Sequence, residues 1–216
     1  MGTHVIALPQ HRPAARPLRR RPSRSRQPVA STQPAVPHAV VGTLVFLGAE
    51  AMFFAGLISA FLVLRAGHAA WPPPDQPRLP IAVTAVNTLI LLFSGYTMRR
   101  AVLDIRAGRT QELNRWLGVT VLLGLTFLLV QGSEWLRLIH YGLTVTSGVY
   151  GSTFYTLIGC HCLHVLGGVV VLLTVLWHAL QGRFSAQEHG VVEASRFYWF
   201  FVVGVWPILY GLVYLL

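Results

Sequence analysis

Five long and almost uncharged runs of apolar residues, joined by short polar segments, constrain the fold of this chain more than any other feature. Each run is at least about 20 residues long, which is the length that an α-helix needs to cross the hydrocarbon core of a bilayer. Backbone groups in hydrocarbon must be hydrogen-bonded within their own segment, so each run is predicted to be helical. The sequence therefore predicts an all-α membrane protein, a bundle of five transmembrane helices. The predicted spans are residues 40–64, 79–98, 116–138, 149–180 and 197–216.

The charged residues lie almost entirely outside these runs. They make up only 11% of the chain, against about 25% in a typical soluble domain. Residues 1–37 are rich in arginine and proline and offer little apolar area to bury, so they are predicted to form a disordered cytoplasmic tail. The transmembrane domain is predicted over residues 38–216.

All 17 basic residues are arginine, and their distribution predicts the orientation of the bundle. With the N-terminus inside and five crossings, 14 arginines fall on the inner side and three on the outer side. This bias has the direction that the positive-inside rule requires. We therefore expect the N-terminus inside and the C-terminus outside, and the net charge of +10 needs no nucleic-acid partner to explain it.

Glu50 is the most informative polar residue inside a predicted span. It lies ten residues into the first span, about 15 Å along the helix. No arginine or lysine lies in a span near that depth, so Glu50 is expected to lack a basic partner. A carboxyl group in hydrocarbon is costly and usually faces the bundle interior. Two interpretations stay open: an acid that handles protons or organises the bundle, and a protonated carboxyl that bonds a neighbouring helix.

His161 and His164 lie near the middle of the fourth span, three residues apart and therefore on one helix face. Cys160 and Cys162 point about 100° to either side of His161, so the four side chains cannot converge on one ion. A structural pair of neutral imidazoles, bonded across helices, is therefore favoured over metal or haem ligation.

Other polar and aromatic residues receive less specific interpretations. Gln131 and Glu134 share a face near the outer end of the third span, where a solvated helix end and a functional contact are equally compatible with the sequence. A polar face of the second span is predicted to pack against other helices; it consists of Asn87, Thr88, Ser94, Gly95 and Thr97. The lipid or membrane-interface residues are predicted to be Trp71, Trp135, Glu193, Tyr198 and Trp199.

Taken in order, motifs in all five spans resemble those of the cytochrome c oxidase subunit III family, in its short, five-helix bacterial form. The matching strings begin or end at Glu50 and Gly56, Asn87 and Gly95, Gln131 and Trp135, Gly151 and Val165, and Glu193 and Trp206. Four residues depart from the family pattern. Phe200 and Val203 stand where the family has His and Asp, Cys162 stands where it has a glycine between the two histidines, and Trp135 stands where it has a tyrosine.

The resemblance implies a non-catalytic subunit of a haem-copper terminal oxidase in the aerobic respiratory chain, in a bacterial inner membrane. Such a subunit packs against oxidase subunits I and II, binds phospholipid, and sustains proton uptake and turnover. The resemblance assigns no catalytic or metal-binding residue to this chain, and it implies that haem and copper lie in the partner subunits. It leaves open the electron donor, cytochrome c or quinol, and a place in a quinol oxidase or nitric oxide reductase complex.

Two functions from other classes are less compatible with the sequence. A transporter or proton channel that uses Glu50 and the two histidines should show an internal repeat or broken helices, whereas only Pro207 interrupts a span. A haem-binding cytochrome needs histidines on facing helices, whereas His161 and His164 share one helix.

Overall fold

The computed structural model describes residues 1–2, 38–73 and 76–216, and this part of the chain is helical with no strand. Its elements are α1 (His38–Ala66), α2 (Ile81–Arg106), α3 (Thr110–His140), α4 (Val149–Leu180), α5 (Gly190–Tyr210) and a final π-helical turn, η1 (Gly211–Leu215). All five α-helices are long and apolar enough to cross a membrane. The predicted five-helix fold is confirmed, whereas the prediction of a disordered tail falls on residues outside those described.

The observed helices differ from the predicted spans mainly at their ends. α5 begins at Gly190, seven residues before the predicted span, and α2 continues to Arg106, eight residues beyond it. A helix does not stop where the hydrocarbon ends, because polar side chains remain compatible with helical backbone in the headgroup region. α2 begins two residues late because Pro80, which precedes it, has a fixed φ and restricts Leu79 to an extended conformation.

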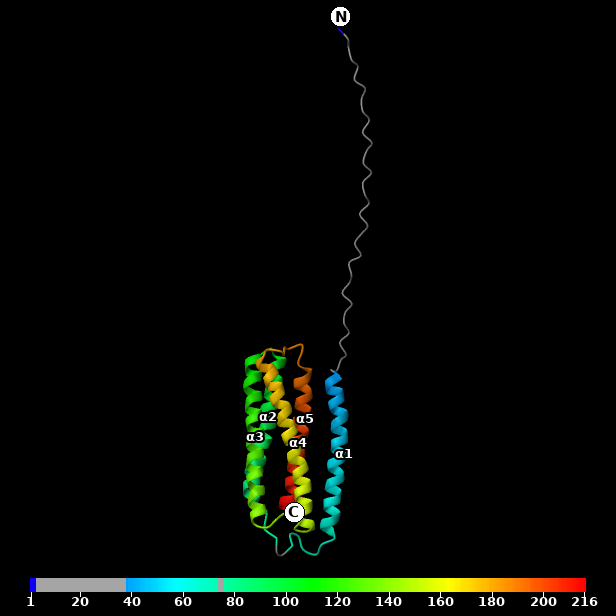
Figure 1. Ribbon diagram of the computed structural model, residues 1–216, viewed down its shortest axis with the longest axis vertical. Helices are drawn as coiled ribbons and strands as arrows, with labels where there is room; N and C mark the ends of the chain where they lie inside the picture. Colours follow the sequence, from blue (N-terminus) through cyan, green and yellow to red (C-terminus); the bar gives the residue numbers. More distant parts are fainter. Residues whose placement is uncertain (3–37, 74–75) are drawn as a thin grey trace. The chain divides into compact units, whose positions relative to one another are not determined.

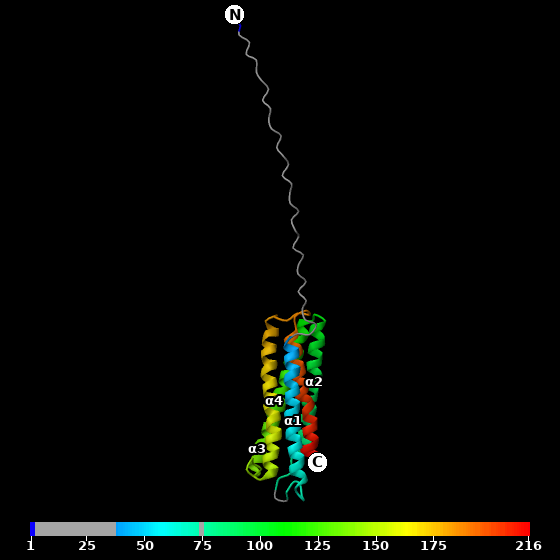
Figure 2. The ribbon, with the colours of Figure 1, turned by 90° about the vertical axis from the view of Figure 1, so that its right-hand side faces the viewer.

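The helices lie side by side in one bundle, with α5 between α1 and the α2–α3 pair (Figures 1 and 2). α2 and α3 form the most extensive helix pair, and α5 contacts α1, α2 and α4. α1 lies at an edge, where it packs against α5 and, over a shorter stretch, against α4. Most of the surface of α1 is therefore left facing outward.

Trp199 is the centre of the packing between α2, α3, α4 and α5. It is 0% exposed, and its indole N–H donates to the Ser94 hydroxyl over 3.1 Å. Gly124 on α3 and Gly168 on α4 leave the space for its ring, because a Cβ at either position would lie 2.8 or 2.9 Å from a Trp199 carbon. The prediction that Trp199 lies at the membrane interface is therefore wrong: its indole N–H finds a partner inside the bundle, so it does not need the headgroup region.

The predicted polar face of α2 packs against other helices. The Trp206 indole donates to the Thr88 hydroxyl over 2.9 Å, and the hydroxyls of Thr97 and Thr120 lie 2.8 Å apart. The Asn87 amide donates to the Phe127 carbonyl over 3.2 Å. These side-chain bonds fix the register of α2 against α3 and α5, where apolar contacts alone would tolerate sliding.

Candidate functional site

The sharpest polar contact inside the bundle joins Glu50 on α1 to His164 on α4. Glu50 Oε2 lies 2.8 Å from His164 Nε2, and each side chain is 18% exposed. The expectation that Glu50 lacks a basic partner is therefore wrong, since the partner is a histidine and not an arginine or lysine. The contact lies where α1 and α4 approach each other, and it ties the edge helix to the rest of the bundle.

The hydrogen bonds of the His164 ring decide how many protons this pair holds. His164 Nδ1 lies 2.6 Å from the Cys160 carbonyl oxygen, and a carbonyl only accepts, so Nδ1 must carry a proton. One further proton then lies between Nε2 and the carboxyl. Either the neutral carboxyl donates to Nε2, or the imidazolium donates from Nε2 to the carboxylate. Both forms have no net charge, so the pair can hold one proton in the membrane without an isolated ion.

Aromatic rings enclose the Glu50–His164 pair. The Phe54 ring meets the His164 ring edge-on with centroids 5.0 Å apart, and Phe53 stacks on it at 6.2 Å. The Tyr198 hydroxyl on α5 donates to the His164 carbonyl over 3.1 Å. Tyr198 was predicted to be an interface anchor, but this bond ties it to the helix that carries the histidine. The rings restrict water around the pair and hold the imidazole in one orientation.

His161 is placed quite differently from His164. It is fully buried, and neither ring nitrogen has a hydrogen-bond partner among the described residues. Its ring stacks on Trp206 with centroids 4.9 Å apart and meets Phe127 edge-on at 6.2 Å. The expectation that both imidazoles bond across helices therefore fails for His161. Helical spacing places both residues on one side of α4, but their side chains leave the helix in somewhat different directions. His164 therefore points to α1, whereas His161 points into the core.

The two histidines should accordingly differ in what they contribute to stability. His161→Leu is expected to change the free energy of unfolding by less than about 1 kcal/mol, because it removes no hydrogen bond to the described residues and keeps similar volume. His164→Leu is expected to cost about 1–3 kcal/mol, because it strands the Glu50 carboxyl. Denaturation of the purified variants in detergent measures both values. Equal losses in the two variants would contradict this difference.

Glu134 and Gln131 lie inside the packing rather than at a solvated helix end. Glu134 is buried, and Arg137 Nη1 donates to its Oε1 over 2.9 Å. Gln131 is buried too, and its amide donates to the Tyr214 hydroxyl over 3.2 Å. Their burial argues against a solvated helix end, whereas a functional contact of these two residues stays a prediction. The structure does not join these residues to the Glu50–His164 pair.

The remaining predicted interface residues fall into two groups. Trp71 and Trp135 are half-buried, and each packs edge-on against a tyrosine of α4, with ring centroids 5.2 and 5.7 Å apart. Glu193 is buried and accepts from Arg106 over 2.7 Å, while Arg196 lies 2.9 Å from its other oxygen. Glu193 therefore joins α2 to α5 by ion pairs rather than contacting lipid.

Metal-ligating side chains do not gather in the part of the chain that the structure describes. No group of three or more His, Cys, Asp or Glu residues there could hold one ion. Cys160 and Cys162 are free thiols on α4. The contact that the structure does show, between Glu50 and His164, allows this pair to hold, accept or release a proton.

Comparison with known proteins identifies the chain's relatives. The sequence model described as cytochrome c oxidase subunit III matches residues 31–216. Cytochrome c oxidase subunit 3 of Synechocystis sp. is 39% identical over 176 residues, which cover 81% of this chain and 74% of the relative. The probable cytochrome c oxidase subunit 3 of Mycobacterium leprae is 38% identical over 175 residues, or 81% and 86% of the two chains. Cytochrome c oxidase subunit 3 of Thermostichus vulcanus is 36% identical over 178 residues, which cover 82% of this chain and 87% of the relative.

The chain belongs to the cytochrome c oxidase subunit III family. It is a subunit III of a haem-copper oxidase, a multi-pass membrane protein that forms a complex with other oxidase subunits. In this member of the subunit III family, the motif on α1 and the motif on α4 meet at Glu50 and His164.

Some residues of this subunit III escaped the sequence analysis. Gly124 and Gly168 admit the Trp199 ring, and Tyr214 receives the Gln131 bond. A small residue on a predicted helix is a general sign of close packing, but it does not reveal which ring enters the space. Tyr214 carried no signal, since a tyrosine near a span end is ordinarily an interface anchor.

Proposed function

We propose that this chain is the non-catalytic subunit III of a haem-copper terminal oxidase in the aerobic respiratory chain of a bacterial inner membrane, with its N-terminus inside. In this role it supports proton uptake and stable turnover of the catalytic subunit. The observation that carries the proposal is the contact between Glu50 and His164, whose geometry allows the pair to hold one proton without net charge. Since each side chain is only 18% exposed, the proton is sheltered but remains close to the lateral surface of the bundle.

We assign haem and copper to the partner subunits I and II and none to this chain. His161 and His164 lie on one helix. Among the described residues, the rings that face His161 from other helices include Trp206 and Phe127 rather than a second histidine. Glu50 occupies the Nε2 atom with which His164 would otherwise bind a metal. The chemistry of this chain is therefore protonic, and electron transfer belongs to its partners.

Bound phospholipid is also part of the proposed role. A hollow of about 620 Å³ lies between α1, α4 and α5, and Phe46, Gly167 and Tyr198 are among its lining residues. Tyr198 also bonds the carbonyl of His164. An acyl chain in this hollow would fill the space beside α1 and limit water access to the pair.

A subunit III-like role in a quinol oxidase or nitric oxide reductase complex is the second candidate. It is favoured by Phe200 and Val203, which replace a His and an Asp of the resembled family. Val203 lies in the core, 3.3 Å from the position that a Cβ at Gly95 would take. A carboxylate there would be buried among apolar groups, so this member has packing where the family pattern has an acid.

Purification of the chain from its native membrane in mild detergent tests the proposal. We expect it to co-purify with a haem-copper catalytic subunit, and we expect the isolated chain to show no haem absorbance. Oxidation assays of the complex with reduced cytochrome c and with quinol distinguish the two candidates. Stoichiometric haem in the isolated chain, or the absence of any haem-copper partner, would refute both.

A further inference from the structure

A groove between α3 and α4 lies apart from the Glu50–His164 pair. Its volume is about 660 Å³, within the range of about 300–1,000 Å³ that is typical of pockets for small ligands. It follows α4 from Tyr155 to Leu166, about 16 Å along the helix, and Val145 of the α3–α4 loop lines it as well. None of its described lining residues belongs to α1, so the proposed protonic role leaves this space unexplained.

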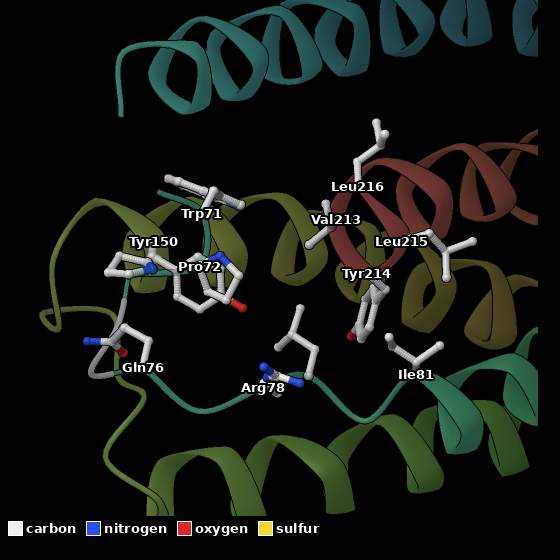
Figure 3. Close-up of a pocket in the computed structure, with 12 residues that line it drawn as sticks. Trp71, Pro72, Gln76, Arg78, Ile81, Tyr150, Val213, Tyr214, Leu215 and Leu216 are labelled. Carbon is white, nitrogen blue, oxygen red and sulfur yellow. The ribbon is translucent and has the colours of Figure 1, made fainter. Parts of the chain in front are cut away.

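The groove is uncharged and opens toward the bilayer. Leu163 and Leu166 line it, and both are exposed on a helix that is long and apolar enough to cross the membrane. None of the described residues that line the groove is charged. The pocket beside the α1–α2 loop is different, because Arg78 and Tyr150 border that space (Figure 3). An ionised group in the groove would lose its hydration and gain no counter-ion, so the groove favours an uncharged, apolar ligand that enters from hydrocarbon.

Two hydrogen-bond donors border the groove without a protein partner. The indole N–H of Trp135 on α3 is buried and forms no hydrogen bond with the residues that the structure describes. The hydroxyl of Thr156 on α4 forms none with them either, whereas the hydroxyls of Thr153 and Thr174 on the same helix donate to carbonyls of the preceding turn. A donor without an acceptor is costly in hydrocarbon, so each of the two is expected to have another partner. A ligand in the groove that accepts hydrogen bonds would supply it.

Gly132 on α3 and Gly159 on α4 keep the groove open. A Cβ at Gly132 would meet nothing within 4 Å, and a Cβ at Gly159 would meet only a Trp135 ring carbon, at 3.6 Å, so close helix contact requires neither glycine. The rings of Trp135 and Tyr155 also line the groove and pack edge-on with centroids 5.7 Å apart. Walls without side chains beside aromatic rings suit a flat ring, which packs favourably on aromatic faces and edges.

An uncharged ligand with a flat ring, hydrogen-bond acceptors and an apolar tail fits these features together. A lone hydrocarbon chain would leave Trp135 and Thr156 without an acceptor, and a phospholipid headgroup would bring a charge that the groove does not neutralise. We propose that the groove binds an isoprenoid quinone. Its carbonyl oxygens accept from the Thr156 hydroxyl and the Trp135 indole N–H, and its tail lies against Leu163 and Leu166. The proposal concerns binding alone and holds whichever electron donor the oxidase uses.

Binding of decylubiquinone to the purified full-length chain in detergent tests this site, with native mass spectrometry as the readout. We expect one tightly bound quinone, which neither hexadecane nor phosphatidylglycerol displaces at equal concentration. Gly132→Leu is expected to weaken quinone binding by about tenfold or more, because the new side chain fills the groove. Thr156→Val and Trp135→Phe are each expected to weaken it by about threefold, because each removes a neutral hydrogen bond and keeps most of the side-chain shape.

Gly118→Leu is the matched control, because Gly118 lies on α3 outside the groove and a Cβ there would also meet nothing within 4 Å. It is expected to bind decylubiquinone like the unmodified chain, so it also accounts for quinone dissolved in the detergent. The proposal is overturned if Gly132→Leu binds the quinone as tightly as Gly118→Leu. It is overturned equally if Thr156→Val and Trp135→Phe both bind it like the unmodified chain, or if hexadecane or phosphatidylglycerol displaces it at equal concentration. None of these outcomes depends on the co-purification or oxidation assays of the proposed function.

Discussion

Trp199→Ala is expected to lower the free energy of unfolding by about 3–5 kcal/mol, as large-to-small substitutions of fully buried aromatic residues do. The indole fills a space that Gly124 and Gly168 leave open, and neither glycine has a side chain with which to refill it. Ser94 also loses the donor that reaches its hydroxyl over 3.1 Å. The loss is measured by unfolding the purified chain in mild detergent through titration with a denaturing detergent.

Trp177→Ala is the control for the Trp199 prediction. Trp177 lies on α4 like Gly168, but its side chain is 65% exposed. The same deletion should therefore cost less than about 1 kcal/mol, since it opens no cavity. Similar losses in the two variants would mean that Trp199 is not the packing centre of the bundle.

Glu50→Gln is expected to leave assembly intact and to shorten the working life of the oxidase. The glutamine amide can donate to His164 Nε2, so the contact between α1 and α4 is kept, but the pair no longer shares a proton. We expect the first turnovers to run at normal rate and half of the activity to be lost after roughly tenfold fewer turnovers, a modest effect beside that of a catalytic proton-transfer group. Oxygen consumption by the purified complex, followed to exhaustion, gives both numbers.

Glu112→Gln provides the comparison for Glu50→Gln. Glu112 is half-buried in the first turn of α3, where its nearest basic partner, Arg115, lies 4.0 Å away. Its substitution makes the same chemical change outside the pair and should leave the working life unchanged. If Glu50→Gln matches the unmodified complex over many turnovers, the pair has only a structural role.

The fold was accessible from sequence because the bilayer imposes a simple rule on backbone hydrogen bonds. Any segment with enough consecutive apolar residues must be helical there, so counting such segments yields five helices without knowledge of their packing. Helix ends were less accessible. α5 starts at Gly190, and α2 runs past Arg99 and Arg100 to Arg106, because helical backbone continues outside the hydrocarbon.

Only part of the candidate site could be predicted from the sequence. Glu50 and His164 both stood out, because polar groups at depth are costly and few. Their pairing could not be predicted, because only arginine and lysine were considered as basic partners of Glu50. In addition, the sequence does not reveal which helix faces which. The positions of Trp199 and His161 were mispredicted for the same reason. A tryptophan is ordinarily expected at the membrane interface, and a buried histidine is ordinarily expected to form a hydrogen bond.

By itself the sequence determined that this chain is a five-helix membrane protein with an acid and two imidazoles in its spans, because helix formation in hydrocarbon depends only on local composition. The tertiary structure alone decided that α1 and α4 meet, so that Glu50 and His164 share a proton, that His161 turns into an aromatic core, and that Arg78 and Tyr150 border one pocket. Contacts between helices depend on rotation and depth, which complementary packing of all five selects together.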